Sequence, residues 1–290
     1  MRFSLVLFFL APLLEAPAHG DGSHDCQVGF SIPSYGPGGE LLWDANGSYT
    51  ESVDKTGKIL LHSPTVSLFS SNGMRIRTLL FESQSAEFDV EGGRISGDGI
   101  VHIVGCGFTA IGERWTFFSR ERLLRVDGHV QVFFETEQAT GDWQLAGDDR
   151  FTATSTGGLL IEDCAGTFSL RFSRQTSLRA QNYSIQCDEL TVEIPLPCGE
   201  EILGQKLPAE SFRMILASGN VRMDDPERHM AADEVRIFPG NDGAIILSGN
   251  VKIIEGGEEV SGQRALIRGD RHCILATEIP GDGEPILDID

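Results

Sequence analysis

The chain has 290 residues, of which 40% are hydrophobic and 23% are charged, and its formal net charge is −20 at pH 7. This apolar content is typical of a globular protein and argues against disorder over most of the chain. The acidic balance argues against nucleic acid and against an anionic membrane surface as partners, because both repel a negatively charged chain.

The first twenty residues have the pattern of a secretory signal peptide. Arg2 supplies a positive charge, residues 3–14 form an apolar stretch, and Ala16-Pro17-Ala18 places small residues at a cleavage site. The apolar stretch is shorter than the roughly 20 residues that a membrane-spanning helix needs. We therefore expect residues 1–20 to be a cleaved signal peptide and the mature chain to be exported, with a permanent anchor as the weaker alternative.

The next segment, residues 21–40, is rich in glycine, serine and proline. Its most biased part is Pro33-Ser34-Tyr35-Gly36-Pro37-Gly38-Gly39, a composition typical of linkers. We expect residues 21–40 to form a flexible leader.

From about Leu41 onward, short runs of apolar residues alternate with polar ones and are broken by Gly, Asn or Asp. Residues 168–172 alternate cleanly and place three apolar side chains on one face, and residues 221–223 and 251–253 follow the same pattern. No sustained helical period occurs after the signal segment. The sequence therefore predicts an all-β mature chain.

The chain also repeats itself. The segment Ser218-Gly219-Asn220-Val221-Arg222-Met223 recurs as Ser248-Gly249-Asn250-Val251-Lys252-Ile253, thirty positions later. Looser copies contain Gly99, Gly128 and Gly158, so that the glycine markers are separated by 29, 30, 61 and 30 positions. The step of 61 corresponds to two units, with Asp188 near the missing marker.

Each unit has a simple physical interpretation. A glycine followed by Asn, Asp or His permits the positive φ of a tight turn or bulge. The residues after it alternate, a polar stretch such as 224–227 or 255–258 reverses the chain, and a second strand such as 230–237 returns. One unit is thus a hairpin of two strands. Since a lone hairpin cannot bury its apolar face, the units must stack on one another.

The two clearest units resemble the OstA-like repeat of the periplasmic lipopolysaccharide-transport proteins (LptA/OstA). The likeness rests on residues 217–221 followed by 231–237, and on the next copy from 247 to 267. Residues 86–132 resemble the related LptC branch. The segments 136–156 and 195–208 fit no repeat.

The resemblance implies an antiparallel β-jellyroll, a solenoid-like stack of strand–turn repeats. It divides the chain into an LptC-like section, residues 41–175, and an OstA-like section, residues 176–290. The implied function is that of a periplasmic lipid-binding protein of the lipopolysaccharide-export kind, in a Gram-negative type of cell envelope. Its implied partners are lipopolysaccharide or a related lipid, together with other jellyroll transport proteins joined by edge-strand pairing.

In this interpretation the apolar face of the repeats shields acyl chains, with about 0.8 kcal/mol gained for each methylene group removed from water. The alternative is a structural β-solenoid or surface interaction protein in which the same face is a closed core without lipid cargo. The candidate lining residues are Val101, Ile103, Val130, Val132, Phe168, Leu170, Phe172, Val221, Met223, Val235, Ile237, Val251 and Ile253.

The sequence contains six cysteines, which in an exported chain permit up to three disulfides. Cys187 and Cys198 flank an apparent hairpin and are the predicted pair, with small buried thiols as the alternative. The histidines and cysteines lack metal-ligand spacing, and neither a nucleophile elbow nor a phosphate loop occurs. We therefore expect a non-enzyme that uses no cofactor and no metal.

Overall fold

A computed structural model shows that the chain is all-β, as predicted, with strands and turns and no helix in the part of the chain that it describes. None of these residues belongs to a helix long and apolar enough to cross a membrane. The predicted signal peptide, residues 1–20, lies outside the described residues. The structure describes residues 26–53, 57–70, 76–137, 150–164, 166–180, 183–196, 203–204, 206–208, 212–239, 244–267, 273–276 and 286–289.

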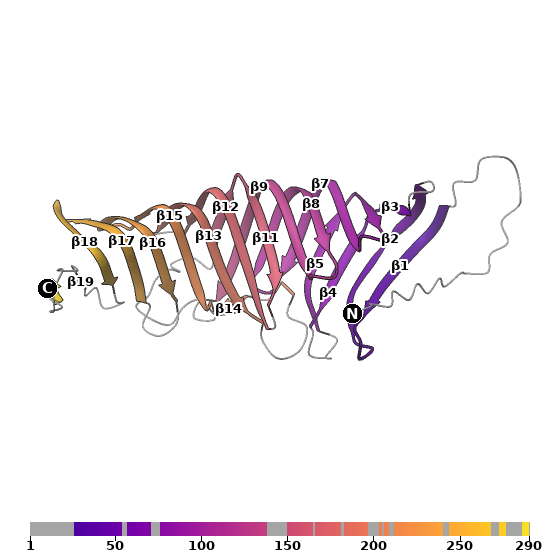
Figure 1. Cartoon of the computed structure of the whole chain (residues 1–290), viewed down its shortest axis with the longest axis horizontal. Coiled ribbons are helices and arrows are strands. Elements are labelled where there is room, and N and C mark those ends of the chain that lie inside the picture. The colour runs from indigo at the N-terminus through magenta and orange to yellow at the C-terminus, as the bar shows by residue number, and fades with distance from the viewer. Residues whose placement is uncertain are drawn as a thin grey trace, which may run out of the picture.

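The strands follow one another along a single long stack (Figure 1). The first strands are β1 (Cys26–Tyr35), β2 (Leu41–Val53), β3 (Lys58–His62), β4 (Thr65–Phe69), β5 (Arg77–Ser83), β6 (Ser85–Asp89), β7 (Arg94–Gly105), β8 (Phe108–Phe118) and β9 (Leu123–Glu137). The later strands are β10 (Arg150–Ser155), β11 (Gly158–Asp163), β12 (Thr167–Arg179), β13 (Ser184–Pro195), β14 (Leu207–Pro208), β15 (Met214–Asp224), β16 (Arg228–Phe238), β17 (Ala244–Glu255), β18 (Glu258–Ile267), β19 (Cys273–Ala276) and β20 (Ile286–Ile289).

Neighbouring strands pair antiparallel, so that one ladder of hydrogen bonds runs from β1 to β20. The short β14 is different, because it pairs in parallel with the end of β9. The arrangement confirms the predicted antiparallel, jellyroll-like stack of strand–turn units.

The long strands bend near their midpoints, at places where the pairing register shifts. Between β15 and β16 the shift lies at Ser218 to Val221, where the two residues Gly219 and Asn220 oppose the single residue Asp233. This is a β-bulge, which sharpens the bend and twist of a strand. In two places a pair of short strands, β3 with β4 or β10 with β11, takes the position of one long strand. The gap between the two short strands then lies beside the bend of the neighbouring long strand. We call this line of bends the crease.

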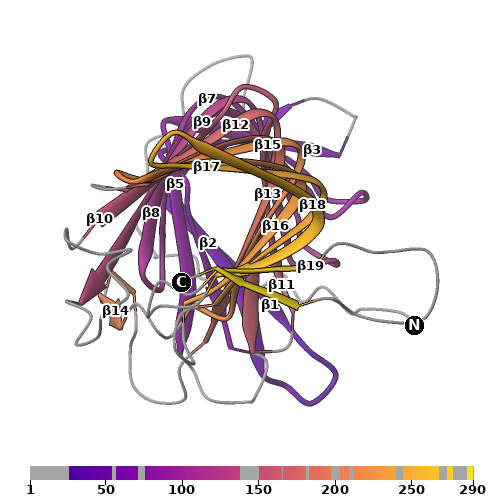
Figure 2. The ribbon, with the colours of Figure 1, turned by 90° about the vertical axis from the view of Figure 1, so that its left-hand side faces the viewer.

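The crease divides the sheet into two layers. Layer I contains β4, β5 and β10, layer II contains β3, β6 and β11, and each long strand contributes one half to each layer. Seen end-on, the ribbons surround a common interior (Figure 2). We call the line opposite the crease, where the strand ends of the two layers face each other, the seam.

Two copies of the Gly-Asn motif have the backbone that the sequence predicted. Gly219 and Asn220 have φ values of 77° and 48°, and Gly249 and Asn250 have φ values of 72° and 46°. The Asn220 side-chain amide donates a hydrogen bond to Asp188 at 2.8 Å, and Asn250 does the same to Asp233. Asparagine is one of the few residues that tolerates this left-handed backbone, which explains its place after the glycine.

Gly128 also has a positive φ, of 85°, at a register shift between β8 and β9, but two other markers of the repeat were assigned less well. Gly99 does not have a positive φ, and Gly158 lies on β11, which runs antiparallel to β9 and β12. The crease of β12 is formed instead by Arg174 and Gln175, with φ values of 61° and 44°. The connections after β9 and after β13 lengthen two of the units, so the thirty-residue step does not hold between Gly128 and Gly219.

Two predicted boundaries need correction. Residues 26–35 are not part of a flexible leader, because they form β1, which pairs with β2 and buries Phe30 and Ile32. The glycines and prolines that follow concealed this alternation, and residues 21–25 lie outside the described residues. The predicted section boundary between residues 175 and 176 lies within β12, which pairs with both β11 and β13, so the sheet is continuous there.

We expect Gly219→Ala to lower the free energy of unfolding by at least about 1–2 kcal/mol, because an L-residue is strained at this φ. A β-carbon would also lie 2.5 Å from the Asp188 carboxylate. Gly99→Ala is the matched control, since Gly99 has open space around it and no positive φ. Urea unfolding monitored by circular dichroism measures both, and equal midpoints for the two variants would contradict the assigned crease.

Candidate functional site

All thirteen predicted lining residues point into the shared interior. The strands place them on the inward faces of both layers, and each is 4% exposed or less. The structure therefore brings the whole set together, as expected, but as a solvent-excluded interior. These residues are Val101, Ile103, Val130, Val132, Phe168, Leu170, Phe172, Val221, Met223, Val235, Ile237, Val251 and Ile253.

The interior has two compositionally different parts. From β2 to β12 it is filled with large rings that contact one another edge to face, such as Trp43 with Phe117 at 5.9 Å and Phe81 with Trp115 at 5.3 Å. Such contacts add roughly 0.5–1.5 kcal/mol each to the burial of the rings. We call this part the aromatic half. Its largest fully buried side chains are Trp43, Phe81, Phe88, Phe108, Trp115, Phe117, Phe134, Phe168 and Phe172.

In the part formed by β13 and β15 to β18, the described strands bury no aromatic side chain. Buried alanines lie close to the crease on β15, β16 and β18, whereas β17 carries Leu247 at the corresponding place. We call this part the aliphatic half. Its buried side chains are Ile185, Cys187, Leu190, Val192, Ile194, Ile215, Ala217, Val221, Met223, Met230, Ala232, Val235, Ile237, Ile245, Leu247, Val251, Ile253, Ala265 and Ile267.

The difference matters for what each half can accommodate. Protein interiors are packed close to the density of organic crystals, so added volume requires side chains or layers to move. Met223 and Met230 are unbranched and adapt to irregular volumes, whereas interlocked rings do not. The aliphatic half is therefore the part of the interior that an apolar guest can enter with the smaller rearrangement.

The connection after β13, which fitted no repeat in the sequence, partly covers the seam. The Gly204 amide donates to the Gly105 carbonyl oxygen at 3.2 Å, and Leu207 pairs with Thr136 at the end of β9. Phe212 packs against Phe134 and Phe151, with ring centroids 5.9 and 5.3 Å apart. This segment starts from layer II and contacts the seam ends of layer I.

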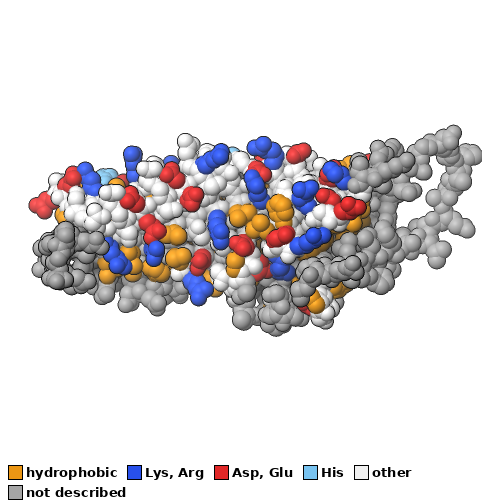
Figure 3. All heavy atoms as spheres, viewed as in Figure 1, with side chains coloured by type: hydrophobic (Ala, Val, Ile, Leu, Met, Phe, Trp, Pro, Cys, Tyr) orange, Lys and Arg blue, Asp and Glu red, His pale blue; other side chains and the backbone are white. Residues whose placement is uncertain are grey.

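The face of the molecule seen in Figure 3 carries charged side chains of both signs, with hydrophobic side chains between them. Opposite charges pair across neighbouring strands of layer II, as in Lys58 with Glu87 at 2.7 Å and Arg171 with Glu162 at 3.2 Å. Such exposed pairs contribute about 0–1 kcal/mol. Among the described residues, no group of three His, Cys, Asp or Glu side chains could hold a metal ion.

A shallow hollow of about 340 Å³ lies at the seam end of layer I, between the β12–β13 and β15–β16 turns. Arg179, Tyr183 and Asp224 contribute polar groups to its wall. Asp224 also contacts His229, whose Nδ1 lies 2.7 Å from the Asp224 Oδ1. The hollow is open to solvent and has a mixed polar and apolar wall, unlike the interior behind it.

The predicted Cys187–Cys198 disulfide is wrong. Cys187 is a free, buried thiol in the middle of β13, a single strand that continues to Pro195, so the two cysteines do not flank a hairpin. A strand advances about 3.3 Å per residue, which places the end of β13 far beyond the 4.4–6.8 Å between α-carbons that a disulfide spans. Cys198 itself lies outside the described residues.

The three free cysteines whose side chains the structure describes differ in exposure and in thiol pKa. Burial raises the pKa of the Cys187 thiol to about 12 and that of Cys106 to about 11, whereas Cys164 is exposed. The thiolate is the reactive form, so both buried thiols are almost fully protonated at pH 8.

We therefore expect iodoacetamide at pH 8 to modify Cys164 and to leave Cys106 and Cys187 unmodified until the protein unfolds. Peptide mass spectrometry before and after addition of urea measures the extent of modification at each position. Modification of Cys187 at the rate of Cys164 in the folded protein would contradict its place in the interior.

Comparison with known proteins gives no assignment: no protein-family model matches the chain, and no curated protein matches it.

Proposed function

We propose that this protein is an exported, periplasmic lipid-binding β-jellyroll that holds acyl chains in the aliphatic half of its interior. The supporting observation is the continuous apolar interior, in which β13 and β15 to β18 bury mainly aliphatic side chains and no aromatic ring. The proposal agrees with the resemblance of residues 217–267 to the OstA-like repeats of lipopolysaccharide export. No catalytic group is needed for such a role.

The energetics favour the acyl part of a lipid as the ligand. Each methylene group transferred from water into an apolar interior stabilises the complex by about 0.8 kcal/mol. The net charge of −20 opposes binding of an anionic head group through long-range attraction. We infer that the head group stays in water at the seam while the acyl chains occupy the space between the layers.

The second candidate is a structural or interaction protein with a closed core. The observation that favours it is the near-complete burial of the thirteen lining residues, none of which is more than 4% exposed. The two candidates differ in one physical property, which is whether the aliphatic half accepts extra volume without loss of stability.

Ala232→Leu tests this difference. Ala232 is 5% exposed and lies beside the crease of β16. If the aliphatic half accommodates guests, the added methyl groups should cost less than about 1 kcal/mol of unfolding free energy and should weaken acyl binding. In a closed core the same change overpacks the interior and costs about 1–3 kcal/mol.

Ala153→Leu is the matched control, because Ala153 is fully buried in the aromatic half and should be destabilised in either case. Urea unfolding gives the stability of both variants. Native mass spectrometry of the gently purified protein, and the shift of its melting temperature with a lipid A analogue, give lipid binding. Absence of bound lipid together with an unchanged melting temperature would refute the lipid-binding function and leave the closed core.

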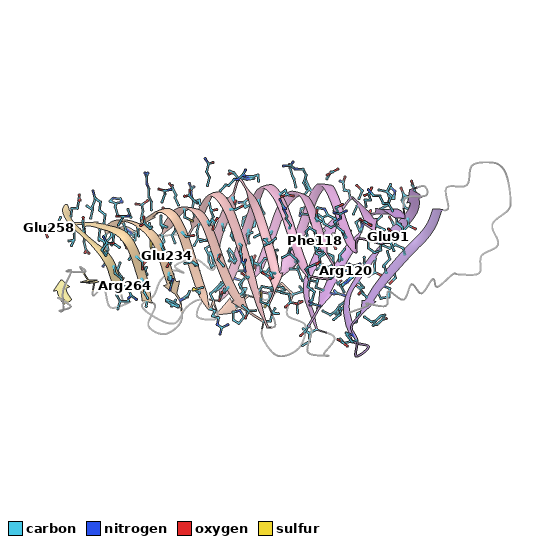
Figure 4. The ribbon with its side chains drawn as sticks, viewed as in Figure 1. Glu91, Phe118, Arg120, Glu234, Glu258 and Arg264 are labelled. Carbon is cyan, nitrogen blue, oxygen red and sulfur yellow. The ribbon has the colours of Figure 1, made fainter. Side chains whose placement is uncertain are left out.

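We further propose that the protein pairs end to end with jellyroll proteins of its own type. In the described part of the chain, β1 pairs only with β2, and β18 meets β19 only through residues 264–267. The outer edges of β1 and of residues 258–263 are thus open to another strand, as strand addition requires. Figure 4 shows Glu258 at the extreme end of the stack.

The two end strands, β1 and β18, both carry residues at the crease that suit pairing between two copies of the chain. Asp188 and Asp233 each receive the asparagine of the next strand, and Gln263 occupies the equivalent position on β18. At the other end, Gly29 of β1 has a φ of 71°, close to that of the glycine in each Gly-Asn pair. A second copy can therefore place β1 antiparallel to β18 with the two creases aligned.

We expect Gln263→Lys combined with Ser261→Lys to weaken self-association, because charged side chains on an edge oppose strand addition. Sedimentation velocity at several concentrations measures the effect. Ser248→Lys on β17, a strand paired on both sides, is the control and should leave association unchanged. Equal association by the double variant and the control would contradict pairing through this edge.

A further inference from the structure

An arginine at the seam occupies an unusual conformation. Arg122 lies in the turn between β8 and β9, at the seam end of layer II, and has a φ of 55°. A left-handed backbone is disfavoured for a long side chain, and it persists only where surrounding contacts stabilise it. The Arg122 side chain is 14% exposed, so its guanidinium is largely removed from water.

The guanidinium contacts both layers. On its own layer it forms an ion pair with Asp163 at the end of β11, with Nε 3.0 Å from Oδ2, and the Asp163 side chain is only 3% exposed. On the opposite layer Nη1 donates to the Leu42 carbonyl oxygen at 3.1 Å, and Nη2 donates to that of Phe69 at 2.5 Å. One side chain thus joins the end of β11 to the seam ends of β2 and β4.

The other ion pairs of the described residues do not have this geometry. They join side chains within a single layer, as in Arg171 with Glu162 on layer II or Arg228 with Glu255 on layer I. The neighbouring Arg120, labelled in Figure 4 beside Glu91 and Phe118, donates to the Glu91 carbonyl oxygen of its own layer. Arg122 is therefore placed to hold the two layers together.

The position of the contact determines what it closes. Leu42 is followed directly by Trp43, which is 2% exposed and packs edge to face on Phe88 and Phe117 in the aromatic half. Separation of β2 from β9 and β11 at the seam would bring water to this ring first. A buried charge that loses its partner is strongly unfavourable, so the pair resists such an opening until both groups are hydrated together.

We propose that Arg122 and Asp163 form a latch that keeps the seam closed over the aromatic half, and that its release opens this part of the interior to solvent and gives an apolar guest a lateral entry toward the aliphatic half. The opening of the seam does not depend on the proposed lipid-binding function, whereas the entry of a guest rests on it. The latch explains how an interior that is fully buried can still be reached from the side.

The test uses the full chain with Trp143→Phe, which leaves Trp43 and Trp115 as the tryptophans of the sequence. Arg122→Gln removes the positive charge and the guanidinium group that donates to both layers. Arg171→Gln is the matched control, because it removes the surface ion pair with Glu162. We expect acrylamide quenching of tryptophan fluorescence to rise at least about twofold in Arg122→Gln and to stay unchanged in the control. Asp163→Asn should reproduce the effect.

Hydrogen–deuterium exchange separates a local latch from general destabilisation. A latch predicts faster exchange at the seam ends of β2, β4 and β11, with unchanged exchange in β15 to β17. Equal acceleration in all strands, or quenching no greater than in Arg171→Gln, would overturn the proposal. If Arg122→Gln does not fold, Arg122→Lys is measured in the same way. Lysine keeps the positive charge but lacks the planar guanidinium that donates to several acceptors at once, so the same outcomes test the latch.

Binding of cis-parinaric acid, a fluorescent fatty acid, distinguishes failure of the latch from failure of the proposed function. Faster uptake by Arg122→Gln is expected if both hold. An opened seam without any uptake would reject the lipid-binding function and retain the latch. Unaltered uptake by a variant whose seam remains closed would reject the latch alone.

Discussion

The bend in the middle of each long strand is the constraint on which the rest of the structure depends. At the crease of β15, Gly219 and Asn220 oppose the single residue Asp233, and this mismatch lets one strand contribute to both layers. Because the same inward face continues through the bend, one apolar stripe of each strand lines both sides of the interior. Without the crease the sheet would leave that stripe facing water.

The crease also explains which side chains lie inside the molecule and which lie on its surface. Inward positions hold apolar side chains and the protonated thiols of Cys106 and Cys187, whereas outward positions carry cross-strand ion pairs. The aromatic and aliphatic halves share the same backbone plan, so their difference lies in side-chain volume. Rings interlock and resist separation, while alanine and methionine leave an interior that can adapt.

The seam lies opposite the crease, where the strand ends of the two layers face each other. A bent sheet closes on one side by its own backbone, and on the other side it must be closed by contacts between strand ends. Leu207 and Phe212, from the segment after β13, provide apolar closure, and Arg122, from the β8–β9 turn, provides polar closure.

The sequence by itself determined the strand class, the repeated hairpin, the bulge at each Gly-Asn pair and the inward direction of the thirteen lining residues. These depend on alternation and on φ preferences, which act between near neighbours. Only the tertiary structure decided that residues 26–35 form β1, that Cys187 lies in mid-strand, that the interior is closed, and that Arg122 reaches Leu42. Arg122 and Leu42 are 80 positions apart, and no local pattern encodes a contact that depends on how a twisted sheet brings its strand ends together.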